Sequence, residues 1–194
     1  MHTGHLLIAG EVLDRLFLDE IIFIPAGEPR FKEHLVITPV AQRYAMVELA
    51  VSGNSYFSVS DAEVRRFGAS FTVDTLGELK NLCHGAELHF IMGWDNLENL
   101  PNWKEPDEIL RLARVVAVPR VGFPRPDLRK LTAALPGIAE RVTILNEPQI
   151  EVSASNIRER VKAGLSIDHL VPPAVERYII ENRLYRNVNA QKES

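Results

Sequence analysis

Cysteine is almost absent from the sequence, which has a single one, Cys83, among its 194 residues. One thiol can form no intrachain disulfide and cannot build a metal centre of several cysteines. The sequence also lacks a run of about 20 apolar residues, the length that spans a bilayer. No apolar signal-peptide core follows Met1. We therefore expect a cytoplasmic protein that does not bind a membrane.

The sequence has no excess of positive charge, with 22 Lys and Arg against 26 Asp and Glu and a net charge of −4. This balance disfavours binding to polymeric nucleic acid, which depends on many cations that neutralise phosphates. A small anionic ligand needs only a local group of cations, so the net charge does not exclude one. Because no repeat interrupts the chain, we expect a single domain over 1–188 and a disordered tail over 189–194.

Short apolar runs that end at Pro, Gly or Asn predict strands buried on both faces. They lie at 21–24, 88–92, 115–118 and 142–145, and 57–60 is a further strand candidate. Apolar residues at helical spacing predict helices between them. These begin near Leu6, Thr38, Val73, Ser153 and Pro173, with Thr38 as a cap and Pro39 as the first helical residue.

The alternation of strands and helices predicts an α/β fold with a parallel sheet. In such folds ligands bind beyond the carboxyl ends of the strands, at the point where the strand order reverses. Four segments follow predicted strands or open a helix in this way. They are 25–32, 93–103, 119–120 and 153–158.

The element His2-Thr3-Gly4-His5 places two histidines three residues apart at the start of a helix. Imidazoles in this position can donate hydrogen bonds to phosphates, aided by the positive end of the helix. Gly4 would let a nucleotide approach the backbone closely. A frayed terminus is the alternative, and zinc is disfavoured because no third ligand is evident.

The element Ser153-Ala154-Ser155-Asn156-Ile157-Arg158 opens a later helix. Ser153 or Ser155 can cap that helix, whose first N–H groups can bind an anion, and Arg158 can reach the same anion. A plain helix cap with a surface arginine is the alternative. Either element alone is a weak signal, because short motifs match by chance.

Together the two elements resemble the paired signatures of the nucleotidyltransferase superfamily, which has a Rossmann-like fold and brackets the triphosphate of ATP or CTP between them. The middle of the chain is similar to bacterial nicotinate-nucleotide adenylyltransferases in particular. The segments that carry this resemblance are 57–66, 68–76, 90–95, 100–103 and 118–122. The likeness extends from His2 to about Tyr185, with Phe71 where the family usually has tyrosine.

This resemblance implies a three-layer α/β/α fold with a doubly wound sheet and adenylyl transfer from ATP to nicotinate mononucleotide in NAD biosynthesis. It assigns ATP binding to His2, Gly4, His5, Ser153, Ser155 and Arg158, and catalytic roles to His2, His5, Lys32 and Arg158. It assigns the acceptor nucleotide to Thr72, Asp95, Trp103 and Arg120, with Thr75 beside them. We expect Mg²⁺ to be held mainly by substrate phosphates and water. Homo-oligomerisation stays open.

The acceptor residues also have structural interpretations. Trp103 could be core packing, although its place after Pro101-Asn102 suggests a loop in which the indole stacks on a pyridine ring. Asp95 could be only a helix cap, Arg120 a solvated turn residue, and Thr72 the start of a helix.

The chain departs from the family in three places. Members usually begin with a strand and a Gly-Gly-Thr-Phe-Asp-Pro loop, which are missing before His2. We therefore expect the natural start about fifteen residues upstream. Segment 25–32 keeps Lys32, but Arg30 and Phe31 replace the usual proline and histidine. The Ser153-Ala154-Ser155 run keeps two of three usual hydroxyls.

Two rival interpretations follow. A pantetheine-phosphate adenylyltransferase or a cytidylyltransferase would share both elements, but segment 70–76 and Trp103 speak against it. A truncated, inactive nucleotide-binding protein is the rival from another class, and the missing first strand favours it. Pyrophosphate release with each acceptor would distinguish them.

Overall fold

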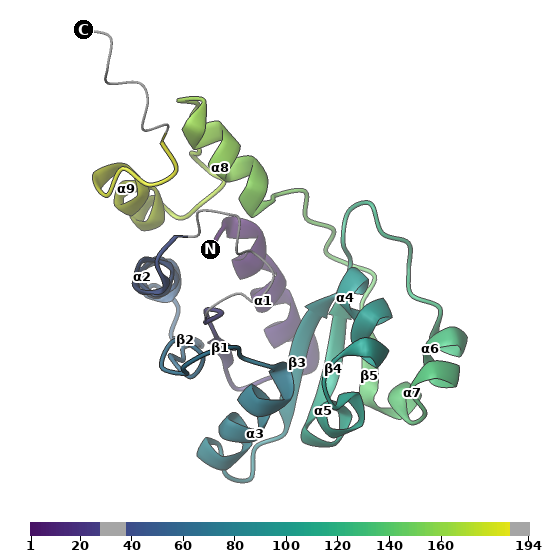
Figure 1. The fold of residues 1–194 in the computed structure, drawn as a ribbon. Helices are drawn as coiled ribbons and strands as arrows, with labels where there is room; N and C mark the ends of the chain where they lie inside the picture. Colours follow the sequence, from purple (N-terminus) through teal and green to yellow (C-terminus); the bar gives the residue numbers. More distant parts are fainter. Residues whose placement is uncertain (28–37, 187–194) are drawn as a thin grey trace, which may run out of the picture. The chain divides into compact units, whose positions relative to one another are not determined.

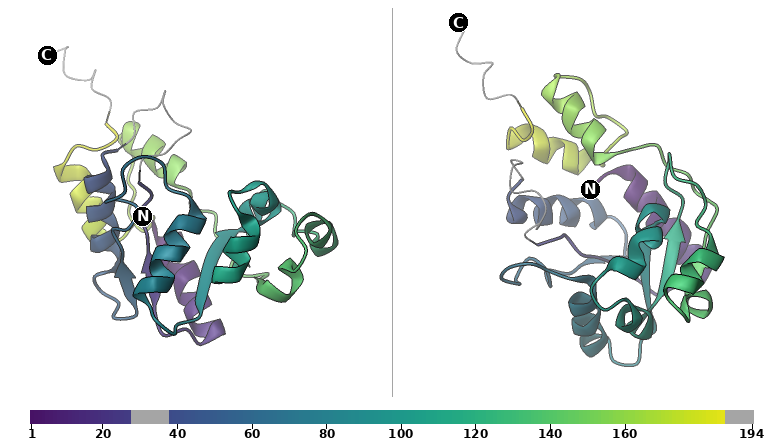
Figure 2. Two further views of the ribbon diagram at one scale, coloured as in Figure 1. Left: turned by 60° about the horizontal axis from the view of Figure 1, so that its bottom comes forward. Right: turned by 45° about the vertical axis from the view of Figure 1, so that its right-hand side comes forward.

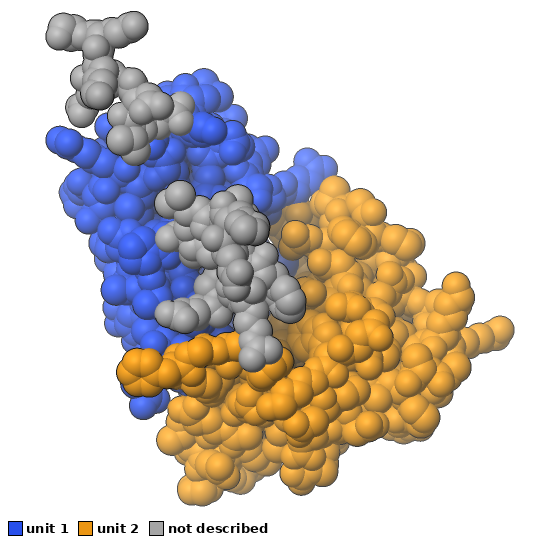
Figure 3. Space-filling view, in the orientation of Figure 1, with its two compact units in different colours: residues 1–65, 151–194 blue, residues 66–150 orange. Residues whose placement is uncertain are grey.

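The computed structural model describes residues 1–27 and 38–186, along which helices and strands alternate (Figures 1 and 2). The chain divides into two compact units, coloured separately in Figure 3. Unit 1 consists of Met1–Arg65 and Glu151–Ser194, and unit 2 consists of Arg66–Ile150. In the described part, no helix has the length and apolar character needed to cross a membrane.

Unit 1 contains a pair of short parallel strands and four helices. The strands are β1 (Ile21–Phe23) and β2 (Phe57–Val59), and the helices are α1 (Thr3–Leu16), α2 (Val40–Val51), α8 (Ala154–Lys162) and α9 (Pro173–Glu181). Helix α2 packs on β2 and on α9. An apolar core joins α2, α8, α9 and the segment that precedes α9. Its buried members are Met46, Ile157, Ile167, Val171, Val175 and Ile179.

Unit 2 contains a parallel sheet of three strands with β4 in the middle. The strands are β3 (Leu88–Gly93), β4 (Ala113–Val118) and β5 (Val142–Ile144). The helices are α3 (Thr72–Leu82), α4 (Trp94–Asn99), α5 (Pro106–Leu112), α6 (Leu128–Ala134) and α7 (Ile138–Arg141), with a 3-10 turn η1 (Leu100–Asn102). Helices α4, α5 and α7 all pack on β4, which explains why this strand is almost entirely buried and apolar.

Within unit 1, the start of α8 lies beside the start of α1 (Figures 1 and 2). The segment that joins α8 to α9 holds α1 at this end. Thr3 donates its backbone N–H to the carbonyl of Leu170 at 3.0 Å, and its hydroxyl donates to the same carbonyl at 3.0 Å. The two helix starts that the sequence singles out are therefore neighbours, although about 150 residues separate them in the chain.

The parallel α/β class is confirmed, and each predicted strand and helix is present. Among the described residues the strands form two sheets, β1-β2 and β3-β4-β5. The sequence pattern does not predict α4 to α7, because helices of four to seven residues contain too few turns to show a clear period. The single domain over 1–188 stays a prediction, and 189–194 lies outside the described residues.

The predicted cap of α2 is wrong. Pro39 occupies the N-cap position instead of the first helical position, and no side chain caps the helix. The Thr38 hydroxyl donates to the phenolic oxygen of Tyr185 at 3.2 Å, so a contact with the end of the chain takes the place of the local cap.

Candidate active site

Two stacked imidazoles stand at the start of α1. His2 is the N-cap, and its ring centroid lies 3.7 Å from that of His5, with 23° between the ring planes. The His2 backbone N–H donates to His5 Nδ1 at 3.4 Å. A neutral His5 that accepts at Nδ1 carries its ring proton on Nε2. His2 is only 6% exposed and Gly4 is buried, whereas His5 is exposed, so His5 is the better placed of the two to meet a ligand.

The start of α8 presents hydroxyls and a guanidinium. Ser153 is the N-cap and accepts a hydrogen bond from the Asn156 backbone N–H at 3.1 Å. Arg158 donates to Ser155 Oγ at 3.1 Å, which leaves the Ser155 hydroxyl proton directed elsewhere. Burial lowers the pKa of the Met1 amino group, and the nearby Arg158 charge lowers that pKa further. The Arg158 charge therefore acts on the residue that precedes α1, while its role toward a phosphate stays a prediction.

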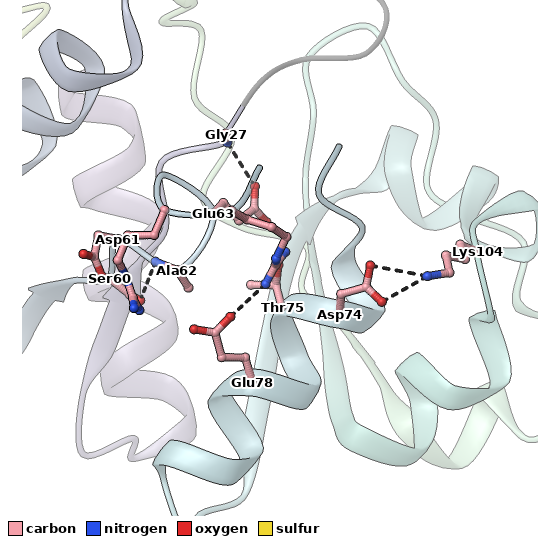
Figure 4. Close-up of polar contacts among 11 residues, drawn as sticks. Gly27, Ser60, Asp61, Ala62, Glu63, Asp74, Thr75, Glu78 and Lys104 are labelled. Carbon is pink, nitrogen blue, oxygen red and sulfur yellow. Dashed lines mark hydrogen bonds and ion pairs between the residues drawn. The ribbon is translucent and has the colours of Figure 1, made fainter. Parts of the chain in front are cut away.

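Arg43, on α2, binds backbone carbonyls next to segment 28–37, a contact that the sequence pattern does not reveal. Its guanidinium donates to the carbonyls of Ala26, Gly27 and Thr38, at 2.8 Å for Gly27 and 3.1 Å for Thr38. Burial lowers the pKa of Arg43. Glu63 holds the same stretch by accepting from the Gly27 N–H at 3.3 Å (Figure 4). These contacts fix the chain on both sides of 28–37; the predicted ligand Lys32 lies outside the described residues.

In unit 2, Asp95 and Arg120 follow the ends of two neighbouring strands. Gly93, the last residue of β3, pairs in register with the last residue of β4, and Asp95 lies in the first turn of α4. A Cβ atom added to Gly93 would lie 2.3 Å from Asp95 Oδ1 and 3.9 Å from Arg120 Cδ. The structure therefore places both Asp95 and Arg120 beside Gly93, where an added methyl group would displace the Asp95 carboxylate.

Thr72 and Trp103 belong to two further segments of unit 2. Thr72 is the first residue of α3, and Trp103 follows η1. The indole packs partly on the core and meets the Phe90 ring edge-on, with centroids 6.2 Å apart. Trp103 is therefore in part core packing, and because its indole stays partly exposed, stacking on a pyridine ring stays a prediction. Thr75 is buried and accepts a hydrogen bond from Arg66 at 2.9 Å, which supports a structural role for this threonine.

Three buried polar atoms in the same segments have no hydrogen-bond partner within the described residues. They are Ser70 Oγ, Trp94 Nε1 and Asp95 Oδ1. Buried polar groups are nearly always paired in folded proteins, and an unpaired one costs about 1–3 kcal/mol. Trp94 and Asp95 are the first two residues of α4, directly after the end of β3. Ser70 lies two residues before the start of α3. Ordered water or a bound ligand is the ordinary partner of such a group.

Comparison with known proteins identifies the family of the chain. The profile of a family described as cytidylyltransferase-like matches residues 1–160. A probable nicotinate-nucleotide adenylyltransferase of Dehalococcoides mccartyi is 50% identical over 186 residues, which are 95% of this chain and 91% of the relative. A protein of the same name from Thermomicrobium roseum is 42% identical, over 98% of this chain and 88% of the relative.

A solved structure has a similar fold. It is the nicotinic acid mononucleotide adenylyltransferase of Plasmodium falciparum, complexed with NaAD. The TM-score is 0.73 at 18% sequence identity, over 95% of this chain and 91% of the other. At this identity the likeness concerns the fold, and it extends along nearly the full length of both chains.

Proposed function

Because the chain belongs to the cytidylyltransferase-like family and, within it, to the nicotinate-nucleotide adenylyltransferases, we propose that it transfers the adenylyl group of ATP to nicotinate mononucleotide. The observation that carries this proposal is the likeness to relatives of that name along nearly their whole length. An oxygen of the acceptor's 5′-phosphate forms a bond to the α-phosphorus of ATP. The bond from that phosphorus to the β-phosphate oxygen breaks, and pyrophosphate leaves with the electron pair.

Such a transfer needs positioning and charge neutralisation rather than covalent help. We assign the triphosphate to unit 1. His5 donates from Nε2 to a phosphate oxygen, and the stacked, buried His2 holds the His5 ring in place. Ser155 and Arg158 bind the departing pyrophosphate, and the Ser153 cap keeps the start of α8 in shape for them. Lys32 adds a further cation.

We assign the acceptor nucleotide to unit 2. Trp103 presents a partly exposed indole on which a flat pyridine ring can stack. Arg120 is exposed and suits the acceptor phosphate, and Thr72 can hydrogen-bond at the start of α3. The Asp95 carboxylate carries a buried oxygen without a partner, which a nucleotide hydroxyl can satisfy as donor.

Mg²⁺ belongs to this proposal through the phosphates of ATP. Within the described residues no group of three or more His, Cys, Asp or Glu side chains could hold a metal ion. Mg²⁺ is usually coordinated by substrate oxygens and water, and we propose the same arrangement here. When bound, the ion neutralises phosphate charge, and the side chains named above position the two nucleotides. Cytoplasmic location and a homo-oligomeric state stay predictions.

The test is pyrophosphate release from ATP and Mg²⁺ with one acceptor at a time. Nicotinate mononucleotide should be used far better than its amide, because a carboxylate accepts two hydrogen bonds where an amide would leave a buried donor or acceptor unpaired. Phosphopantetheine and CTP-dependent acceptors test the rival transferases. Equal kcat/KM values for the acid and the amide would contradict the assigned acceptor. ATP binding without turnover of any acceptor would indicate a binding protein.

A further inference from the structure

Lys104, the residue after Trp103, contacts residues at the start of α3, which is distant in the sequence. Its ammonium donates to both carboxylate oxygens of Asp74 on α3, at 3.0 and 3.3 Å (Figure 4). The same ammonium lies 4.6 Å from the centre of the Phe71 ring, at a distance where a cation and an aromatic face attract each other. Glu105, the next residue, adds a weaker contact at 3.8 Å.

These contacts connect two segments that carry proposed acceptor ligands. Phe71 is the N-cap of α3 and directly precedes Thr72, and Asp74 lies two residues after Thr72 in the first turn. Lys104 directly follows Trp103. One ammonium therefore fixes the chain on both sides of Thr72 and next to Trp103, over a separation of about thirty residues in the sequence.

Both anchors of this contact are themselves well held. Phe71 packs against the apolar core of unit 2, as Trp103 does. Helix α3 is held a turn further along by Arg66, which donates to Thr75 at 2.9 Å and to Glu78 at 2.9 Å. Lys104 thus attaches the Trp103 segment to a helix that other contacts hold on the core. Within the described residues, the indole is otherwise oriented by packing on Phe90 and the core, and the Trp103 backbone N–H donates to Leu100 at 3.0 Å.

We propose that Lys104 is a positioning residue of the acceptor site, which sets the indole of Trp103 relative to Thr72 by holding Asp74 and Phe71. The proposal deepens the proposed function and rests on it, because the acceptor nucleotide is what these two residues bind there. Lys104 acts on the acceptor site through the two segments that it joins. Its removal should therefore weaken binding of the acceptor and leave ATP unaffected.

The experiment compares Lys104→Met, Asp74→Asn, the double variant and the conservative Lys104→Arg. The side chains of Lys104 and Asp74 are 39% and 41% exposed, so the ion pair is a modest one, and the expected effect is moderate. Lys104→Met should raise KM for nicotinate mononucleotide about three- to tenfold. KM for ATP should not change, and kcat should change less than twofold. Lys104→Arg should keep KM for nicotinate mononucleotide near the value of the unaltered protein.

Arg111→Met on α5 is the matched control. Arg111 pairs with Glu108 at 2.5 Å in the same unit, and this pair joins two residues of α5 to each other instead of joining α5 to another segment. The Asp74→Asn single variant should resemble Lys104→Met, and the double variant should be no worse than either, because both remove one contact. Additive effects in the double variant, an equal rise in KM for ATP, or an unchanged acceptor KM in folded Lys104→Met would each overturn the proposal.

A second measurement does not need turnover. The chain has two tryptophans, so 5-fluorotryptophan labelling gives two ¹⁹F resonances, which Trp103→Phe assigns. Lys104→Met should shift or broaden the Trp103 resonance and leave that of Trp94 in place, and Arg111→Met should move neither. An unmoved Trp103 resonance overturns the positioning role. Loss of activity in the unaltered protein would contradict the proposed function instead, while this resonance still tests the contact.

Discussion

Gly93→Ala should lower the activity of the protein much more than its thermal stability. Gly93 has φ −74° and ψ 158°, which alanine adopts without strain, so the backbone gives no reason for glycine. The obstacle is the added methyl group, whose carbon would lie 2.3 Å from Asp95 Oδ1, against a practical minimum of 3.0 Å. The carboxylate must therefore move by about 0.7 Å or more. The atom that must move is the end of a flexible side chain, while the backbone can stay.

The two consequences of this movement differ in size. A side chain forced about 30° from its rotamer costs about 0.5–1.5 kcal/mol, so thermal melting should fall only slightly. A ligand group displaced by about 1 Å can cost about 100-fold in rate, equal to about 2.7 kcal/mol. We expect kcat/KM to fall by about 10- to 100-fold, with the larger part coming from lost contact to the nucleotide.

The assay is pyrophosphate release with both substrates varied, run beside differential scanning calorimetry. Asp95→Ala and the Gly93→Ala/Asp95→Ala double variant complete the comparison. If Gly93 acts only by leaving room for the carboxylate, the double variant should be no less active and no less stable than Asp95→Ala. A Gly93→Ala protein with unchanged kcat/KM, or a double variant with additive losses, would refute this reasoning.

Three further outcomes follow from the same structure. Trp103→Ala should raise KM for nicotinate mononucleotide about tenfold, since stacking contributes about 1–3 kcal/mol, and KM for ATP should change little. An unchanged KM for nicotinate mononucleotide together with a lower melting temperature would show that Trp103 is core packing only. Arg158→Ala should reduce kcat/KM by about 2–4 kcal/mol of transition-state stabilisation, and near-normal turnover of the folded variant would leave Arg158 as a surface residue. Arg43→Met should lower the free energy of unfolding, measured by urea denaturation, by about 2–4 kcal/mol, because three backbone carbonyls lose a charged donor. An unchanged midpoint of the urea denaturation curve would show that water replaces the guanidinium.

The order of elements and the residue types of the site could be predicted from the sequence. Buried parallel strands need continuous apolar runs such as Val115-Val116-Ala117-Val118, and this requirement is local. The helix starts at His2 and Ser153 are local too, because a helix leaves its first N–H groups unpaired wherever it begins. These features do not depend on which distant residues come to lie nearby, so the chain order alone reveals them.

Contacts between distant segments could not be predicted, because long-range pairing is decided by packing. Nothing in the pattern around Arg43 indicates that it binds carbonyls at Ala26, Gly27 and Thr38. The burial of His2 beneath the exposed His5 depends on how α1 is held at Leu170. Lys104 is one charge among many in the sequence, and only the folded chain brings it to Asp74. Side chains with weak local preferences acquire their roles from neighbours that the tertiary structure supplies.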